Sequence, residues 1–150
     1  MSATAERNRM LAIRLGEIIN SRRYDQLDAI VRPDFTRHCQ ATPDVQVHSL
    51  AQFKEFLRQD VRAFPDAALL GTRVLADSDM VAIWASYSGT QQGPLGKHPA
   101  YPPSGHHARV DVAVFLRVED DMIAEMWETW DQLTLLTQLG HLPALVYADL

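Results

Sequence analysis

The sequence has little of what several protein classes require, beginning with cysteine. Cys39 is the single cysteine among 150 residues, so no intrachain disulfide bond can form and a reducing compartment is expected. No apolar run approaches the roughly 18–20 residues of a membrane-spanning helix. The first ten residues also lack the apolar segment of a secretion signal. These features predict a soluble cytoplasmic protein that has no membrane partner.

Positive charge is also scarce, and so are the motifs of metal and nucleophilic catalysis. The chain has 14 Lys and Arg residues against 19 Asp and Glu residues, a net charge of −5. Nucleic acids and anionic membranes require a basic face, so neither is an expected partner. No two histidines have the spacing of a metal-binding pair, and no serine lies in a nucleophile motif. Any chemistry is therefore predicted to proceed without a metal or another cofactor.

The first half of the chain predicts three helices. Apolar residues at helical spacing indicate a helix over Ala5–Ile19 and a shorter one over Tyr24–Val31. Pro33 is expected to end the second helix, because the residue before a proline avoids helical backbone angles. Ser49 followed by Gln52 has the spacing of a capping box, and it predicts the start of the third helix.

The second half predicts a sheet. After a short extended segment at Phe35–Cys39, four strands alternate with turns: Ala68–Ala76, Met80–Thr90, His106–Val118 and Met122–Trp130. The segment Gln91–Gly105 is too rich in proline and glycine to be a regular element. Gln132–Leu139 predicts a last helix that ends at Gly140. The order indicates one α+β domain over residues 1–150, a cone in which helices cover one face of a curved antiparallel sheet.

The last predicted strand carries a carboxylate among apolar residues. Met126, Glu128 and Trp130 share one face, because alternate residues of a strand point to the same side. A carboxylate on a buried face is either a paired structural group or a group that performs chemistry. As a structural group, Glu128 would pair with an arginine such as Arg37 or Arg109.

Trp127 and Trp84 are predicted to lie on opposite sides of the sheet. Ile123 and Trp127 alternate with Glu128, and we expect both to point outward. Outward apolar residues favour a homodimer that forms through the outer face of the sheet. Glu125 is expected at the surface or in that interface. Trp84 is expected to line the inside of the cone, either as a ligand contact or as ordinary core packing.

Four short motifs, in this order, carry a family resemblance. They are Arg32-Pro33-Asp34-Phe35, Ala63-Phe64-Pro65-Asp66, Pro102-Pro103-Ser104-Gly105, and the closing stretch from Trp127 to Gly140 with Trp130-Asp131 and Gln138-Leu139-Gly140. In order and spacing the chain resembles the SnoaL-like polyketide cyclases and their ester cyclase relatives, within the nuclear transport factor 2-like superfamily. The resemblance implies a cystatin-like α+β cone with a pocket between sheet and helices.

The resemblance also implies a chemistry. In the cyclases, one pocket carboxylate acts as general acid/base in an intramolecular aldol condensation that needs no cofactor, and its position here is Glu128. A supporting histidine of the cyclases falls on Val114, and a polar residue two positions earlier falls on Val112. An asparagine of the cyclases falls near Arg37, whereas His38 matches a histidine common in the ester cyclase branch.

These observations give a set of candidate catalytic residues. Glu128 is expected to move the proton, with its pKa raised by apolar neighbours. His38 and Asp131 are expected to assist it or to orient the substrate. Each has an ordinary alternative, because a lone histidine is often a satisfied partly buried residue and Asp131 directly precedes a helix that it can cap.

An apolar wall is expected to bind the substrate. Its candidate residues are Trp84, Val112, Val114, Met126 and Trp130. Their apolar character predicts a hydrophobic carbonyl compound and cyclase, isomerase or hydrolase chemistry. Two other functions stay open: a protein that binds an apolar small molecule without reaction, and a purely structural dimerisation module.

Overall fold

The computed structural model describes residues 1–96 and 101–144. Part of the loop Gln91–Gly105 and the last six residues of the predicted 1–150 domain lie outside this range. The elements in chain order are α1 Ala3–Ser21, the 3-10 helix η1 Tyr24–Ala29, β1 Val31–Cys39, α2 Leu50–Ala63, β2 Ala68–Asp77, β3 Met80–Thr90, β4 His107–Glu119, β5 Met122–Trp130 and α3 Gln132–Gln138. In this part of the chain, no helix has the length and apolar character needed to cross a membrane.

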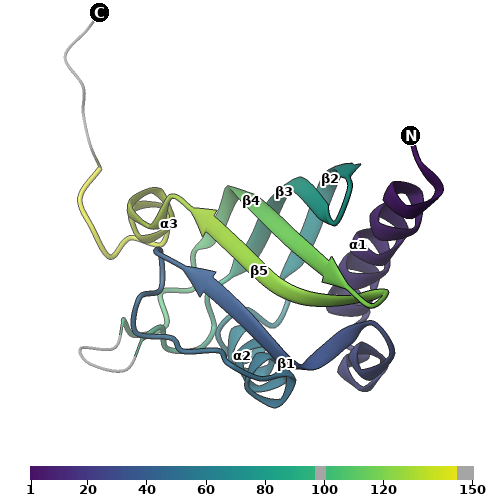
Figure 1. The fold of residues 1–150 in the computed structure, drawn as a ribbon. Coiled ribbons are helices and arrows are strands. Elements are labelled where there is room, and N and C mark those ends of the chain that lie inside the picture. Colours follow the sequence, from purple (N-terminus) through teal and green to yellow (C-terminus); the bar gives the residue numbers. More distant parts are fainter. Residues whose placement is uncertain (97–100, 145–150) are drawn as a thin grey trace, which may run out of the picture.

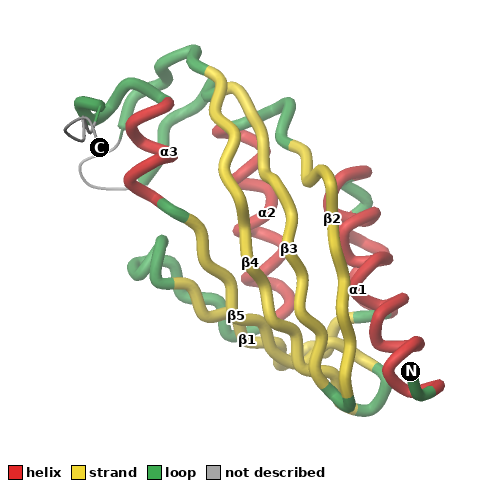
Figure 2. The backbone as a smooth tube through the Cα atoms, turned by 90° about the horizontal axis from the view of Figure 1, so that it is seen from above, coloured by secondary structure: helices red, strands yellow, loops and turns green. Residues whose placement is uncertain are grey.

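A curved five-stranded sheet forms the centre of the molecule, in the order β1-β5-β4-β3-β2 (Figure 1). The four strands predicted from the second half pair as antiparallel neighbours. Seen from above, α1 lies beside β2, and α2 lies behind β3 and β4 (Figure 2). The predicted α+β cone is confirmed. The prediction of a wholly antiparallel sheet is wrong, because β1 adds a fifth strand that runs parallel to β5.

The segment around Pro33 differs most from the prediction. The expected helix over Tyr24–Val31 is a 3-10 helix that ends at Ala29, and Val31 already begins β1. Pro33 lies within β1 instead of ending a helix. A strand tolerates proline at a sheet edge or an irregularity, and both conditions hold, because β1 is an edge strand whose pairing with β5 shifts between Val31 and Thr36.

The helix termini follow local rules. The Ser49 hydroxyl accepts a 3.1 Å hydrogen bond from the Gln52 N–H, as predicted. The Gln52 side chain accepts a 2.7 Å bond from the His48 N–H, one residue before the position expected for a capping box. Gly140 ends α3 with a φ of 82°, a conformation that glycine adopts without a steric penalty.

A bulge in β5 changes which side chains are buried. The pairing of β4 with β5 shifts between Arg117 and Val118, so that Val118 is opposite Ile123 and Arg117 is opposite Glu125. Ile123 is therefore in the core with no exposed surface, and the prediction that it points outward is wrong. Strict alternation fails here because the bulge inserts one extra residue into β5, so the residues before the bulge point to the opposite face from the one that alternation predicts. Trp127, beyond the bulge, is on the outer face as predicted and is 37% exposed.

Candidate active site

Glu128 lies on the inner face of the sheet, toward the helices. Cross-strand pairing places it opposite Val114 on β4 and Cys39 on β1, and Val114 is opposite Ile83 on β3. All four residues are only partly buried, although they lie on the face that packs against the core. This row of Ile83, Val114, Glu128 and Cys39 therefore keeps accessible surface on the covered side of the sheet.

Arg37 of β1 is the partner of Glu128. Its Nε donates a 2.7 Å hydrogen bond to Glu128 Oε2, and the two side chains are 0% and 20% exposed. Of the two arginines considered from the sequence, Arg37 is therefore the one that pairs. A buried guanidinium requires a compensating charge, so this ion pair neutralises Arg37 and keeps one oxygen of Glu128 in a fixed position.

Aromatic rings and one hydroxyl hold the guanidinium of Arg37. Its central carbon lies 4.1 Å from the centre of the Phe56 ring and 5.9 Å from that of Trp130. Its Nη1 donates a 3.4 Å bond to Thr42 Oγ1, whereas its Nη2 is buried without a hydrogen-bond partner among the described residues. Stacking on aromatic faces suits the planar arginine head group and leaves Nη2 as an unsatisfied donor beside Glu128.

Asp60 of α2 is a second inward carboxyl group, which the sequence analysis missed. The Tyr87 hydroxyl of β3 lies 3.0 and 3.1 Å from its two oxygens. Burial raises the pKa of Asp60 to about 6, and the nearby charge of Glu128 adds to this, while the Tyr87 hydrogen bond and the charges of Arg37 and Arg22 oppose it. Burial and the Asp60 charge in turn raise the pKa of Tyr87.

Helical spacing could have revealed Asp60. It lies four residues after Phe56 on the same stripe of α2, and four before Phe64, which directly follows the helix. Phe56 stacks on Arg37, and Phe64 is fully buried against Tyr87. A carboxylate inside an apolar helical stripe is the same signal that identified Glu128 on its strand.

His38 is on the opposite side of the sheet from Glu128. It pairs in register with Trp127, its ring stacks on Trp127 at 5.4 Å, and its Nε2 lies 2.6 Å from Glu125 Oε2. His38 was expected to assist Glu128 in a pocket, but its side chain lies on the other side of the sheet and does not reach Glu128. The reason is the parallel pairing of β1, which turns Arg37 inward and its neighbour outward.

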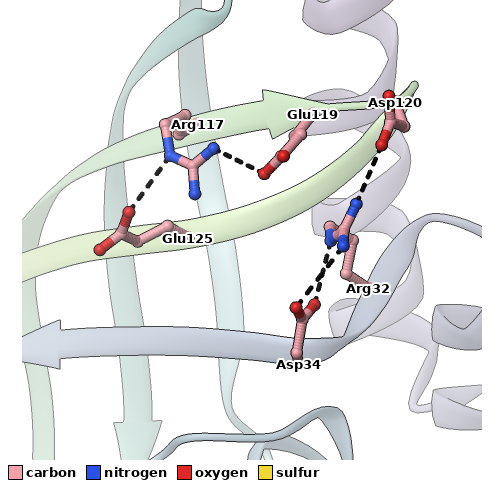
Figure 3. Close-up of polar contacts among 6 residues, drawn as sticks. All are labelled: Arg32, Asp34, Arg117, Glu119, Asp120 and Glu125. Carbon is pink, nitrogen blue, oxygen red and sulfur yellow. Dashed lines mark hydrogen bonds and ion pairs between the residues drawn. The ribbon is translucent and has the colours of Figure 1, made fainter.

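The outer face around Glu125 carries an ion-pair network. Arg117 lies between Glu119 and Glu125, while Arg32 lies between Asp34 and Asp120 (Figure 3). The hydrogen bond from His38, followed by that from Arg117, lowers the pKa of Glu125. Glu125 therefore lies on the outer face, as predicted, and is paired there with His38 and Arg117.

Trp84 is also on the outer face, with 52% of its surface exposed, so the prediction that it lines the cone is wrong. It pairs with Ala113, whereas Ile83 and Ala85 on either side point inward. A hollow of about 600 Å³ lies at this part of the sheet. Its wall is formed by residues of β3, β4, β5 and the start of α3: Trp84, Arg109, Val110, Asp111, Ala113, Thr129, Trp130, Asp131 and Thr134.

The remaining predicted wall residues are on the inner side. Val112 and Met126 are 5% and 4% exposed, and Val114 is partly buried against the same core cluster. Trp130 is partly buried, with its Nε1 donating a 2.7 Å bond to Gln132 Oε1. Glu128 therefore has the apolar surroundings that were expected from the alternation of β5.

Asp131 caps α3. Its Oδ1 accepts a 3.0 Å bond from the Thr134 N–H, and its Oδ2 accepts a 2.7 Å bond from the Thr134 hydroxyl. These bonds lower the pKa of Asp131. The capping role predicted from the sequence is confirmed, and it occupies both carboxylate oxygens.

Metal ligands do not gather at this site. Within residues 1–96 and 101–144, no three His, Cys, Asp or Glu side chains are arranged so that they could hold a metal ion. Asp60 and Glu128 have Tyr87 and Arg37 as their respective partners. The arrangement that the chain itself provides is a carboxylate bonded to the buried Arg37, and a second carboxyl group, Asp60, on which the charges of both act.

Comparison with known proteins identifies the family. The family model of the SnoaL-like polyketide cyclases matches residues 9–139. Similar solved structures include a protein from Jannaschia sp. CCS1 assigned as a SnoaL-like polyketide cyclase, with 22% identity, a TM-score of 0.83, and coverage of 95% of this chain and 98% of that one. TsrD from Streptomyces laurentii has 22% identity, a TM-score of 0.78, and coverage of 95% and 99%.

AclR from Streptomyces galilaeus, assigned as a hydroxylase, has 25% identity, a TM-score of 0.77, and coverage of 96% of this chain and 87% of that one. No curated protein matches the sequence. The family model spans nearly the whole chain, and the similar solved structures have the same cone-shaped fold as this chain. The chain belongs to the SnoaL-like polyketide cyclase family.

Proposed function

We propose that this protein is a cyclase-type enzyme that performs acid/base chemistry without a cofactor on a hydrophobic carbonyl compound. The observation that carries the proposal is Glu128, a partly exposed carboxylate on the inner face of the cone that is fixed by the buried Arg37. Val112, Val114 and Met126 supply an apolar wall beside it. The family membership supports the same chemistry.

Glu128 accepts a proton from the carbon next to the substrate carbonyl. One of its oxygens is held by Arg37, so the carboxylate is oriented before the substrate arrives. The proton leaves carbon, the electron pair forms an enolate, and the enolate carbon then attacks a second carbonyl of the same molecule. The related isomerase reaction uses the same first step and returns the proton to a different carbon.

Proton exchange tests this step without knowledge of the natural substrate. β-Tetralone, a compact hydrophobic ketone, loses its α-proton NMR signals in deuterated water when a base removes them. We expect the protein to accelerate this loss and Glu128→Gln to reduce the acceleration by about 100-fold or more, the usual contribution of a general base. Full exchange activity in Glu128→Gln would show that Glu128 is not the base.

Glu125→Gln is the matched control, since it changes the same residue type on the same strand but on the outer face. It should leave the exchange rate unchanged. Saturation-transfer NMR on the same samples separates catalysis from binding alone. If β-tetralone binds the wild-type protein without faster exchange, the non-catalytic small-molecule-binding function is favoured instead.

We also propose a homodimer through the outer face of the sheet. Leu75, Phe115 and Trp127 lie in one cross-strand row and are 75%, 53% and 37% exposed. An apolar band of this kind on a sheet face favours association. Sedimentation equilibrium should give a dimer for the wild-type protein and a monomer for Phe115→Glu. A wild-type monomer at micromolar concentration would contradict the proposal.

A further inference from the structure

We propose that Asp60 is the general acid of this site: it protonates the acceptor carbonyl oxygen after Glu128 has removed the proton from the substrate carbon. The inference rests on the proposed function and adds a second catalytic residue to it. It comes from the arrangement of α2 and β3 against the Arg37–Glu128 pair.

Two contacts and one helical spacing place Asp60 near Glu128, whose charge acts on it. Phe56 stacks under Arg37 at 4.1 Å, and Asp60 follows Phe56 by one helical turn on the same stripe of α2. Tyr87 reaches across from β3 and donates its hydroxyl to the Asp60 carboxyl. The helix and the sheet therefore present their carboxyl groups to one interior region.

The two carboxyl groups have opposite electrostatic surroundings. Glu128 is bonded to the positively charged guanidinium of Arg37 at 2.7 Å. Asp60 has a neutral phenol as its direct partner, and its pKa is raised to about 6 by burial, with a further contribution from Glu128. The charged groups that act on it are Glu128, Arg37 and Arg22. Such a difference in surroundings between two carboxyl groups of one site is the arrangement that separates a base from an acid.

The proton transfers balance over one aldol cyclisation. Glu128 gains the proton from carbon as the carbon–hydrogen bond breaks and the enolate forms. The enolate carbon then forms the new carbon–carbon bond with the acceptor carbonyl carbon. The acceptor carbonyl oxygen gains a proton from Asp60 and becomes a hydroxyl group. Glu128 is then protonated and Asp60 ionised, and exchange with water restores both groups without a co-reactant. Tyr87 donates to the Asp60 carboxylate that remains after transfer and so stabilises it.

Carboxyl-carbon NMR on protein labelled with ¹³C in Asp and Glu tests the arrangement. Asp60→Asn identifies the Asp60 resonance, which we expect to titrate with a midpoint near 6. Glu128→Gln should move this midpoint to lower pH, because it removes a nearby negative charge. Tyr87→Phe should move it to higher pH, because it removes a hydrogen bond to the ionised form. Glu55→Gln, which changes a half-exposed carboxylate on α2 that does not act on Asp60, is the control and should not move it.

An Asp60 midpoint near the ordinary aspartate value, or one that ignores both Glu128→Gln and Tyr87→Phe, would overturn the inference. The NMR result does not depend on turnover, so it stands apart from failure of the β-tetralone assay. With a cyclisable aromatic diketone as the probe, Asp60→Asn should lower kcat and abolish the loss of rate above pH 6. Equal cyclisation rates and pH profiles for Asp60→Asn and wild type would also refute the acid role.

Discussion

Asp60→Asn should change how the free energy of unfolding depends on pH. The burial of Asp60 determines the direction of this change. The pKa of Asp60 is raised from its ordinary value of 3.8 to about 6 in the folded protein. A raised pKa means that the folded state binds the proton more tightly than the unfolded state does. The stabilisation is therefore complete below pH 3.8 and is lost as the pH rises through 6.

The size of the effect follows from this difference in pKa. About two pH units, at about 1.4 kcal/mol each, give about 3 kcal/mol as an upper value. Asparagine has no proton to lose, but its amide oxygen can still accept the Tyr87 hydroxyl. Relative to wild type, the free energy of unfolding of Asp60→Asn should therefore increase by up to about 3 kcal/mol between pH 4 and pH 7.

Urea unfolding at pH 4, 5, 6 and 7, followed by circular dichroism, measures this difference. Most other titrating groups are common to both proteins and cancel in the comparison. Glu55→Gln should unfold in parallel with wild type across the series, because the Glu55 side chain is 46% exposed and its ion pairs are with the exposed Arg58 and Arg62. A difference between Asp60→Asn and wild type that stays constant from pH 4 to pH 7 would refute the argument that burial perturbs Asp60.

Other substitutions test other parts of the structure by the same unfolding measurement. Arg37→Met should lower the free energy of unfolding by about 3–5 kcal/mol, because it leaves Glu128 without its partner. The double variant with Glu128→Gln should recover part of this loss. A larger loss in the double variant would contradict the prediction. Ile123→Ala should lower the free energy of unfolding by about 2–5 kcal/mol, because Ile123 is in the core. Trp127→Ala, on the outer face, should lower it clearly less. Equal losses would contradict the burial of Ile123 by the bulge in β5. Asp131→Ala should destabilise the protein at pH 7 but not at a pH well below the ordinary aspartate pKa. The hydrogen bonds of the cap lower the pKa of Asp131, so the stabilisation that the ionised cap gives is lost as the pH falls. A loss of stability that does not depend on pH would argue against a charged cap.

Features that depend on neighbouring residues were predictable from the sequence. The bounds of β3 and β5 match the prediction, α1 extends two residues beyond it at each end, and Ser49 and Asp131 cap helices as expected. Periodicity and cap chemistry act over a few residues, so they can be read before the fold is known. Alternation along β5 likewise showed that Glu128 and Met126 share one face, and the apolar residues of that face indicated its burial.

Features that depend on distant pairing were decided only by the tertiary structure. The parallel pairing of β1 with β5 turns Arg37 inward and His38 outward, and the bulge in β5 buries Ile123. Trp84 is outward because β3 has its opposite face on the core. A two-residue period shows which side chains share a face but does not say which face is buried. Asp60 acquires its raised pKa only when α2 closes over the sheet, because desolvation depends on what packs around the carboxyl group and not on its neighbours in the sequence.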